Sequence, residues 1–319
     1  MNVTEYLQKW SVSYRDDMLG NIMPFWLKHG LDLRNGGVYT CLDRDGSLID
    51  TTKSVWFQGR FAFTCSYAYN HIEQNPEWLA AAKSTIDFIE QHCFDSDGRM
   101  FFEVTASGEP LRKRRYVFSE TFAAIAMAEY AIASGEREYA EKALKLFKDI
   151  QRFLNTPGVL EPKYWNTVQS KGHSIVMILI NTASRIRAAI ADPALDKQID
   201  DSIALLQKDF MHPEFNALLE TVGSNGEFID TINGRIINPG HCIETSWFIL
   251  EEAKYRNWDK QLTDMALTIL DWSWEWGWDK EYGGIINFRD CRNLPPQDYA
   301  HDMKSVSYTH LRAHETPEH

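Results

Sequence analysis

The sequence predicts an all-α protein built from helical pairs, and two observations carry that prediction. First, turn-rich segments recur about every sixty residues along the 319-residue chain, a period typical of repeat architectures. Second, the apolar residues between these segments follow the 3.6-residue spacing of helices rather than the alternation of strands. The turn-rich segments lie at 34–39, 95–100, 155–158, 212–215 and 278–284. Each helical pair is therefore expected to pack on its neighbours in the chain.

Candidate helices fill the intervals between the turns, with boundaries set by cap and turn residues. In chain order they span 3–28, 54–72, 77–93, 117–134, 137–153, 173–191, 195–210, 241–256 and 260–277. Short alternating stretches at 38–42 and 100–104 predict small β-hairpins in the long loops. An Asp-Gly turn at 45–46 and a Ser-Gly turn at 107–108 would close them. Sheet is expected to be a minor decoration of a helical fold.

Two-helix units joined by long loops on one side can close into a toroid of inner and outer helices with a site at its centre. Six such units complete a ring, and the candidate helices fall short of that by roughly seventy to eighty residues. The stretch 305–319 shows neither an aromatic-rich loop nor an apolar helix face. We therefore expect one domain over 1–304, and a non-native tail over 305–319 with a native disordered terminus as the alternative.

Composition argues against several classes of function. The formal net charge of -12 and the pI near 5.3 argue against nucleic acid and anionic membranes as partners. No apolar run is long enough to span a bilayer and the N-terminus resembles no leader, so we expect a soluble, cytoplasmic protein. Five scattered cysteines without a Cys-x-x-Cys pair predict reduced thiols rather than disulfides or a structural zinc site.

The segment 238–248 predicts a catalytic corner at the start of a helix. Asn238 suits the N-cap and Pro239 suits the first helical position. His241 and Glu244, three residues apart, share one face of that helix. The positive end of the helix dipole disfavours an imidazolium, so we expect a neutral His241 that accepts a proton near neutral pH. The alternative is a structural histidine near a helix cap.

Five ordered motifs carry further information about function. They are Gly36-Gly37-Val38-Tyr39-Thr40-Cys41-Leu42, Val55-Trp56-Phe57-Gln58-Gly59-Arg60, Asn238-Pro239-Gly240-His241-Cys242-Ile243-Glu244, Gly277-Trp278-Asp279-Lys280-Glu281-Tyr282-Gly283-Gly284 and His301-Asp302-Met303-Lys304. Together they resemble the N-acylglucosamine 2-epimerase family, which also includes cellobiose 2-epimerases and aldose-ketose isomerases. The resemblance implies an (α/α)6 toroid. It also implies an isomerase that interconverts N-acylglucosamine and N-acylmannosamine, with the cellobiose and aldose-ketose activities as close alternatives.

The resemblance implies roles for individual residues. In the family two histidines face C2 of the opened sugar from opposite sides; His241 matches the first, and the second is expected beyond Lys304. The open-chain aldehyde accepts the charge as an enediolate, so no redox cofactor is required. Arg60 is the candidate donor to the developing oxyanion, with a surface arginine as the alternative. Glu244 would hold the His241 tautomer or bond a sugar hydroxyl, against a plain helix-face carboxylate.

Further candidates for substrate binding come from the starts of other inner helices and from aromatic loop residues. They are Tyr39, Tyr116, Glu120, His173, Asn181 and Trp278. The tyrosine in the first motif and the tryptophan in the fourth offer stacking surfaces for a sugar. Glu120 would equally serve as a cap. His173 would equally be structural, as a single histidine at a helix start usually is.

Several alternatives stay open. A metal site would use His241 with Glu244, but no third and fourth ligand stand at a recognisable spacing, so no metal is expected. Cys242 as a nucleophile would point away from the face of Glu244. A glycoside hydrolase on the same toroid would need two opposed carboxylates, and a noncatalytic sugar binder would need none. Nucleotide activation, known in the N-acylglucosamine branch, and a homodimer are hypotheses that the sequence does not decide; the expected partner is a small sugar.

Overall fold

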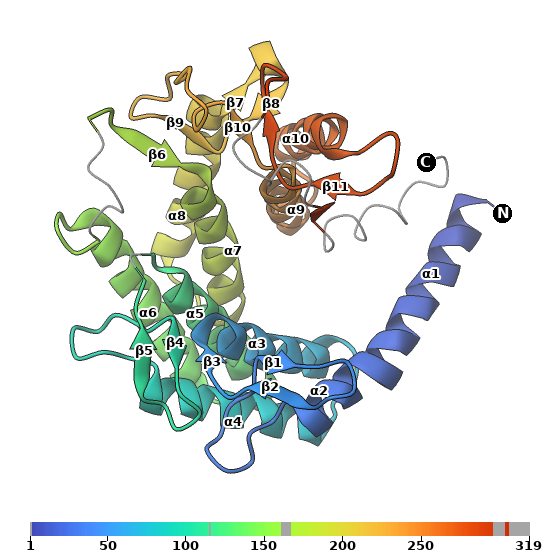
Figure 1. The fold of residues 1–319 in the computed structure, drawn as a ribbon, viewed down its shortest axis with the longest axis vertical. Coiled ribbons are helices and arrows are strands. Elements are labelled where there is room, and N and C mark those ends of the chain that lie inside the picture. Colours follow the sequence, from blue (N-terminus) through green and yellow to red (C-terminus); the bar gives the residue numbers. More distant parts are fainter. Residues whose placement is uncertain (1, 115, 161–166, 296–303, 306–319) are drawn as a thin grey trace. The chain divides into compact units, whose positions relative to one another are not determined.

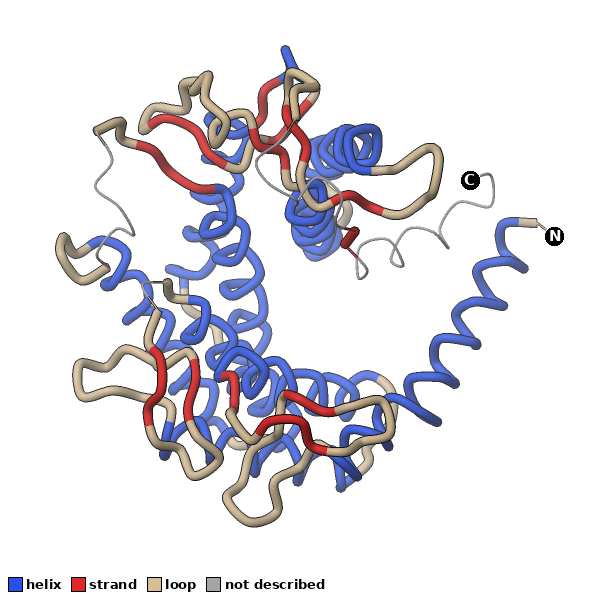
Figure 2. Tube along the Cα trace, in the orientation of Figure 1, coloured by secondary structure: helices blue, strands red, loops and turns tan. Residues whose placement is uncertain are grey.

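The computed structural model describes residues 2–114, 116–160, 167–295 and 304–305 of the chain. Helices dominate these residues, as Figure 1 and Figure 2 show. The α-helices are α1 (Val3–Asp17), α2 (Met23–His29), α3 (Val55–His71), α4 (Pro76–His92), α5 (Phe118–Ser134), α6 (Arg137–Asn155), α7 (His173–Ala189), α8 (Pro193–Leu205), α9 (Pro239–Tyr255) and α10 (Lys260–Gly277). Each predicted helix is confirmed. The first is divided by a π-helical turn, η1 (Met18–Ile22), and another, η2 (Leu206–Phe210), prolongs α8.

The strands are short and pair mostly in twos. They are β1 (Cys41–Leu42), β2 (Leu48–Asp50), β3 (Lys53–Ser54), β4 (Glu103–Val104), β5 (Pro110–Arg112), β6 (Ser170–Gly172), β7 (Met211–His212), β8 (Ala217–Leu218), β9 (Thr221–Gly223), β10 (Ile236–Ile237), β11 (Ile285–Ile286), β12 (Arg289–Asp290) and β13 (Lys304–Ser305), with one 3-10 turn, η3 (Pro213–Phe215). The two predicted hairpins are confirmed as the antiparallel pairs β1–β2 and β4–β5. The pairs β6–β9, β10–β12 and β11–β13 join segments far apart in the chain.

The chain divides into two compact units. Unit 1 comprises Met1–Ser11, Asn166–Asn181 and Asp196–His319, and unit 2 comprises Val12–Trp165 and Thr182–Leu195. The expected tail over 305–319 lies outside the described residues, except that Ser305 pairs with Ile285 between β13 and β11.

Unit 2 is organised around α5, which is buried on every side from Ser119 to Ala131. The outer helix α6 buries one face only, with apolar residues three and four apart, as an amphipathic helix requires. Gly59 of α3 lies against Phe122 of α5, where a Cβ atom would come within 2.7 Å of the Phe122 backbone. A side chain at this position would push the two helices apart, so the glycine of the second motif sets their close packing.

Unit 1 contains α9 and α10, which pack side by side (Figure 1). The Ser246 hydroxyl in α9 donates to the Ala266 carbonyl in α10 at 2.7 Å. The side chain of Asp259 caps α10 by accepting from the amides of Gln261 and Leu262. Capping and this cross-link fix the position of α9, whose first turn carries His241.

Among the described residues, no helix combines the length and the apolar character needed to cross a membrane.

Candidate active site

The predicted start of α9, with its capping residue, is confirmed. Asn238 is the N-cap, with extended backbone at φ -106° and ψ 93°, and its side-chain oxygen accepts from the His241 amide at 3.1 Å. Pro239 is the first helical residue. Its missing N–H costs nothing there because the first amides of a helix have no helical partner. The His241 side chain is 32 % exposed, so a ligand can reach it.

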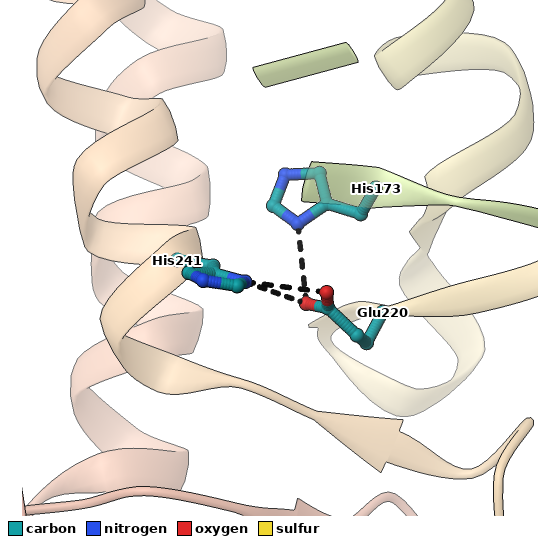
Figure 3. Close-up of side chains that lie close together, drawn as sticks. All are labelled: His173, Glu220 and His241. Carbon is teal, nitrogen blue, oxygen red and sulfur yellow. Dashed lines mark hydrogen bonds and ion pairs between the residues drawn. The ribbon is translucent and has the colours of Figure 1, made fainter. Parts of the chain in front are cut away.

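Three side chains meet at this corner: His241, Glu220 and His173 (Figure 3). The Glu220 oxygens lie 3.0 and 3.2 Å from Nδ1 of His241. Nδ1 of His173 lies 3.6 Å from Oε2 of Glu220. The centroids of the two imidazole rings are 6.3 Å apart. One carboxylate therefore faces two imidazoles.

The small sheets bring this carboxylate to the helix starts. In the antiparallel pair β6–β9, Gly172 stands opposite Thr221, and the next amide, that of His173, donates to the Glu220 carbonyl at 3.0 Å. The Glu220 amide donates to the Ile236 carbonyl at 2.9 Å. The backbone of Glu220 is thus held from both sides. The expectation that the β-strands have only a minor role is wrong for the β6–β9 pair, because this pairing positions Glu220, the acidic partner of His241.

Glu220, and not Glu244, is the carboxylate that holds the His241 ring. Glu244 contributes a favourable charge from the same helix, but the hydrogen bond to Nδ1 comes from 21 residues earlier in the chain. Glu220 was not among the predicted site residues, because a contact between residues 21 positions apart leaves no helical spacing in the sequence. One signal was present: a lone carboxylate stands inside the apolar run 217–222. Such a residue requires a partner.

The direction expected for the pKa shift of His241 is also wrong. Burial by itself would lower the pKa of His241, but the hydrogen bond and charge of Glu220, aided by the charge of Glu244, raise it above 6.5. A full charge at hydrogen-bond distance outweighs the partial charge of a helix terminus. Burial would raise the pKa of Glu220, but the two imidazoles hold it down at about 2. His241 therefore favours the imidazolium form more than an isolated histidine.

His173 is completely buried and its ring is oriented by Thr245. Nε2 of His173 lies 2.8 Å from the Thr245 hydroxyl oxygen, and that hydroxyl donates to the His241 carbonyl at 2.9 Å. His173 was predicted to bind the substrate, but its burial leaves it no surface on which a sugar could lie. It stands behind Glu220.

The same three residues have the donor set of a metal site. Nitrogen atoms of His173 and His241 and an oxygen of Glu220 lie within 4.8 Å of one another. Two imidazoles and a carboxylate are the protein ligands of several catalytic zinc sites. The sequence showed no third or fourth ligand at a recognisable spacing from His241 and Glu244, whereas the structure brings Glu220 and His173 beside His241 from other parts of the chain. A cation here would displace the hydrogen bond between His241 and Glu220.

Two further candidates of unit 1 are placed as follows. Trp278 stacks on Trp274 with ring centroids 4.6 Å apart and planes at 16°, so one face of the predicted sugar platform is occupied by packing. Asn181 is half-buried in α7, about two turns after His173. Cys242 is buried, its thiol lies 3.4 Å from the Leu218 carbonyl, and burial raises its pKa strongly. It is a packing residue, as the sequence indicated.

In unit 2, Arg60 and Tyr39 line one cavity of about 370 Å³ whose other walls are largely apolar. The exposed Arg60 guanidinium lies over the Phe122 ring, 4.2 Å from its centroid. The first two motifs are joined by Gln58, which accepts from the Val38 amide at 2.8 Å and donates to the Val38 carbonyl at 2.7 Å. This bond pair holds the loop of Tyr39 against α3.

Gly37 explains part of the first motif. Its φ is +72°, a conformation that side chains disfavour, and a Cβ atom would lie 2.6 Å from the Gln58 side-chain oxygen.

The prediction that Glu120 contacts sugar is wrong. Glu120 is completely buried in α5 and accepts from Arg99 at 2.6 Å and from the Met100 amide at 3.0 Å. Tyr116 is 44 % exposed, and its carbonyl accepts from the Arg99 guanidinium at 2.8 Å. Only Tyr116 of this pair is accessible to a ligand.

Comparison with known proteins agrees with the fold and the motifs. The chain resembles the solved structure of a cellobiose 2-epimerase from Bacillus thermoamylovorans, with a TM-score of 0.78 and 21% identity, over 89% of this chain and 76% of that one. It also resembles a sugar epimerase from a ruminal bacterium, with a TM-score of 0.73 and 22% identity, over 92% and 76% of the two chains. These likenesses confirm the predicted (α/α)6 fold class.

The sequence comparisons identify the family. The profile of the N-acylglucosamine 2-epimerase (GlcNAc 2-epimerase) family matches residues 37–310. The N-acylglucosamine 2-epimerase of Bos taurus is 30% identical over 90% of this chain and 69% of its own length, and that of Homo sapiens is 28% identical over 94% and 72%. A cellobiose 2-epimerase of Dictyoglomus turgidum is 24% identical over 77% and 66%. The chain belongs to the N-acylglucosamine 2-epimerase family.

Proposed function

We propose that this protein interconverts N-acylglucosamine and N-acylmannosamine by moving the proton at C2 of the open-chain sugar. The observation that carries the proposal is His241, a partly exposed imidazole whose Nδ1 is bonded to Glu220 at 3.0 Å. The second ring nitrogen, Nε2, lies on the other edge of the ring and can face a ligand. Relatives with this activity share the family profile over most of the chain.

The chemistry follows from the acidity of C2–H in the open sugar. When the ring opens, the aldehyde at C1 accepts the electron pair as an enolate with its charge on O1, so removal of the proton from C2, the carbon that carries the acylamino group, becomes accessible to an imidazole. His241 exchanges the proton on one face of C2. A second group on the opposite face completes an inversion, and His173 is unsuited to that role because its ring is completely buried. No redox cofactor is needed, because the substrate is neither oxidised nor reduced overall.

Arg60 is proposed as the donor that stabilises the enolate oxygen at C1. Its support is the match to the second family motif and its exposed guanidinium on the cavity that Tyr39 shares. A guanidinium keeps its charge at every pH of interest and offers several donors to an oxyanion. Tyr39 and Tyr116 are proposed to contact the sugar, whereas the buried Glu120 does not reach it.

Reduced cysteines support a cytoplasmic location, which we also propose. All five cysteines are free thiols, and burial raises the pKa of Cys65 and of Cys93 to about 12. Such thiols resist oxidation because the reactive thiolate is scarcely populated.

The test is deuterium incorporation at C2. The protein is incubated with N-acetylmannosamine, and separately with N-acetylglucosamine, in deuterated water while the C2 proton is followed by NMR. Loss of that signal in a His241-dependent manner supports proton transfer, and appearance of the other epimer shows inversion. Cleavage of a glycosidic bond without exchange would favour a hydrolase instead, and binding without either reaction would favour a sugar binder.

A further inference from the structure

The His241 corner contains a carboxylate that no part of the proposed reaction uses directly. Glu220 touches two imidazoles, is 20 % exposed at its side chain, and comes from neither helix that carries them. A carboxylate in a largely buried position costs free energy unless its partners compensate. Its position between β8 and β9 is fixed by backbone hydrogen bonds on both sides, so its placement is not incidental.

The first step concerns the tautomer of His241. An ionised carboxylate only accepts hydrogen bonds, so the nitrogen 3.0 Å from Glu220 must carry a hydrogen. That nitrogen is Nδ1. In the neutral ring Nε2 then holds the lone pair, and in the imidazolium Nε2 holds the transferable proton. Either way the nitrogen turned away from Glu220 is the one that exchanges a proton with a ligand.

The second step concerns His173, whose tautomer follows from the two hydrogen bonds of the Thr245 hydroxyl. The single hydroxyl proton of Thr245 is committed to the His241 carbonyl at 2.9 Å. Its oxygen can therefore only accept from Nε2 of His173 at 2.8 Å, so that nitrogen carries a hydrogen. Nδ1 of His173 is buried, has no hydrogen-bond partner in the described part of the chain, and points at Glu220 (Figure 3).

We propose that Glu220 is a positioning residue of the reaction: it holds His241 as the Nδ1–H tautomer so that Nε2 exchanges the proton with C2, and the hydrogen bonds of the Glu220 backbone to His173 and Ile236 hold Glu220 in place. This inference rests on the proposed function, but its geometric part can be tested without a substrate. Carboxylates that orient a catalytic histidine in this way act through the tautomer and through the charge that they place beside the ring.

The charged groups that face His241 decide the expected pH behaviour. Among the described residues they are Glu220 from the loop between β8 and β9, Glu244 from the same helix, and His173 from α7. The two carboxylates favour the imidazolium of His241. Removing the charge of Glu220 should therefore lower the pKa of His241, and removing that of Glu244 should lower it less, because the charge of Glu244 is the smallest of the effects that raise this pKa.

The experiment compares Glu220→Gln, Glu220→Leu and Glu244→Gln with the parent protein. The pKa and tautomer of His241 are read from NMR of protein with labelled histidine, assigned with His241→Asn. Glu220→Gln keeps an acceptor but loses the charge, so the pKa should fall while C2 exchange drops about tenfold. Glu220→Leu also loses the acceptor, so the tautomer should become mixed and exchange should drop on the order of a hundredfold. KM should change less than about twofold in both, because the substrate contacts remain.

A matched control exists in the same unit. A carboxylate oxygen of Glu214 lies 2.9 Å from Nδ1 of His212, and the Glu214 side chain is 57 % exposed. Glu214→Gln should perturb the signals of His212 and leave the pKa of His241 and C2 exchange unchanged. It shows that a lost carboxylate–histidine pair elsewhere does not mimic the effect.

Three results would overturn the proposal. The first is an unchanged or raised His241 pKa in Glu220→Gln. The second is a parent protein whose His241 carries its hydrogen on Nε2 alone. The third is C2 exchange that disappears with a chelator and returns with Zn²⁺, because the three residues would then be metal ligands. If the NMR results hold but neither sugar exchanges its C2 proton, the positioning geometry stands and the proposed function fails.

Discussion

The starts of α5 and α9 are built on the same plan and serve different purposes. Each carries a titratable side chain at its third residue, Glu120 in α5 and His241 in α9. Each is bonded to a partner of opposite charge that stands 21 residues earlier in the chain, Arg99 and Glu220 respectively. Yet the Glu120 side chain is fully buried and that of His241 is 32 % exposed.

The difference shows that the role of the titratable residue at each helix start depends on its charged partner and on the exposure of its side chain. The guanidinium of Arg99 does not release its proton at ordinary pH, so the pair with Glu120 is a fixed charge pair that holds the loop before α5. The imidazole of His241 beside Glu220, in contrast, is a side chain that can take up and release a proton, and it can reach a ligand. The first pair contributes to folding, and the second supplies a proton-transfer group.

Arg99→Ala should have the largest effect, and the effect should be on stability. It leaves the Glu120 carboxylate buried without its partner, which costs about 3–5 kcal/mol. Urea unfolding measures the loss. The surface pair of Arg137 and Glu141 provides the control, since Arg137→Ala should change stability by less than about 1 kcal/mol. A small effect of Arg99→Ala would mean that the two helix starts do not differ as described.

His241→Asn should reverse this pattern. The substitution removes the proton-transfer group, so C2 exchange should fall roughly a hundredfold or more. The amide of residue 241 still donates to Asn238, so the urea midpoint should stay close to that of the parent. Exchange near the parent rate would remove His241 from the reaction.

Arg60→Ala tests whether a residue of unit 2 belongs with the reactive group. Loss of one donor to a developing oxyanion lowers kcat by on the order of a hundredfold. Arg60→Lys keeps the charge but not the planar donor set, and should recover only part of the rate. Equal rates for both variants and the parent would show that Arg60 is a surface arginine lying on Phe122.

The smallest expected effect is the pH dependence of stability contributed by the His241–Glu220 pair. The raised pKa of His241 stabilises the fold below 6.5, and this contribution is lost as pH rises through the raised value. The lowered pKa of Glu220 stabilises the fold above 4.5, and this contribution is lost as pH falls towards about 2. The difference in urea midpoint between the parent and Glu220→Gln should therefore be largest between these limits. A difference that is flat from pH 3 to pH 8 would contradict the coupling.

Much of the fold could be predicted from the sequence because its signals are local. Helical periodicity located the helices, and Asn238 with Pro239 marked the start of α9 because capping and a fixed φ act within one turn. The histidine at that start was found for the same reason. The close approach of α3 and α5 at Gly59 required knowledge of the partner helix and was not predicted.

The sequence by itself determined the helical pairs, the capped start of α9 and the presence of His241 in its first turn, because these depend on neighbours within a few residues. Only the tertiary structure decided which carboxylate holds that histidine, in which direction its pKa moves, and that Glu120 is closed off by Arg99. Both partners arrive from 21 residues away through strand and loop placement. Electrostatic effects fall with distance in space, not along the chain, so no local pattern could rank Glu220 above Glu244.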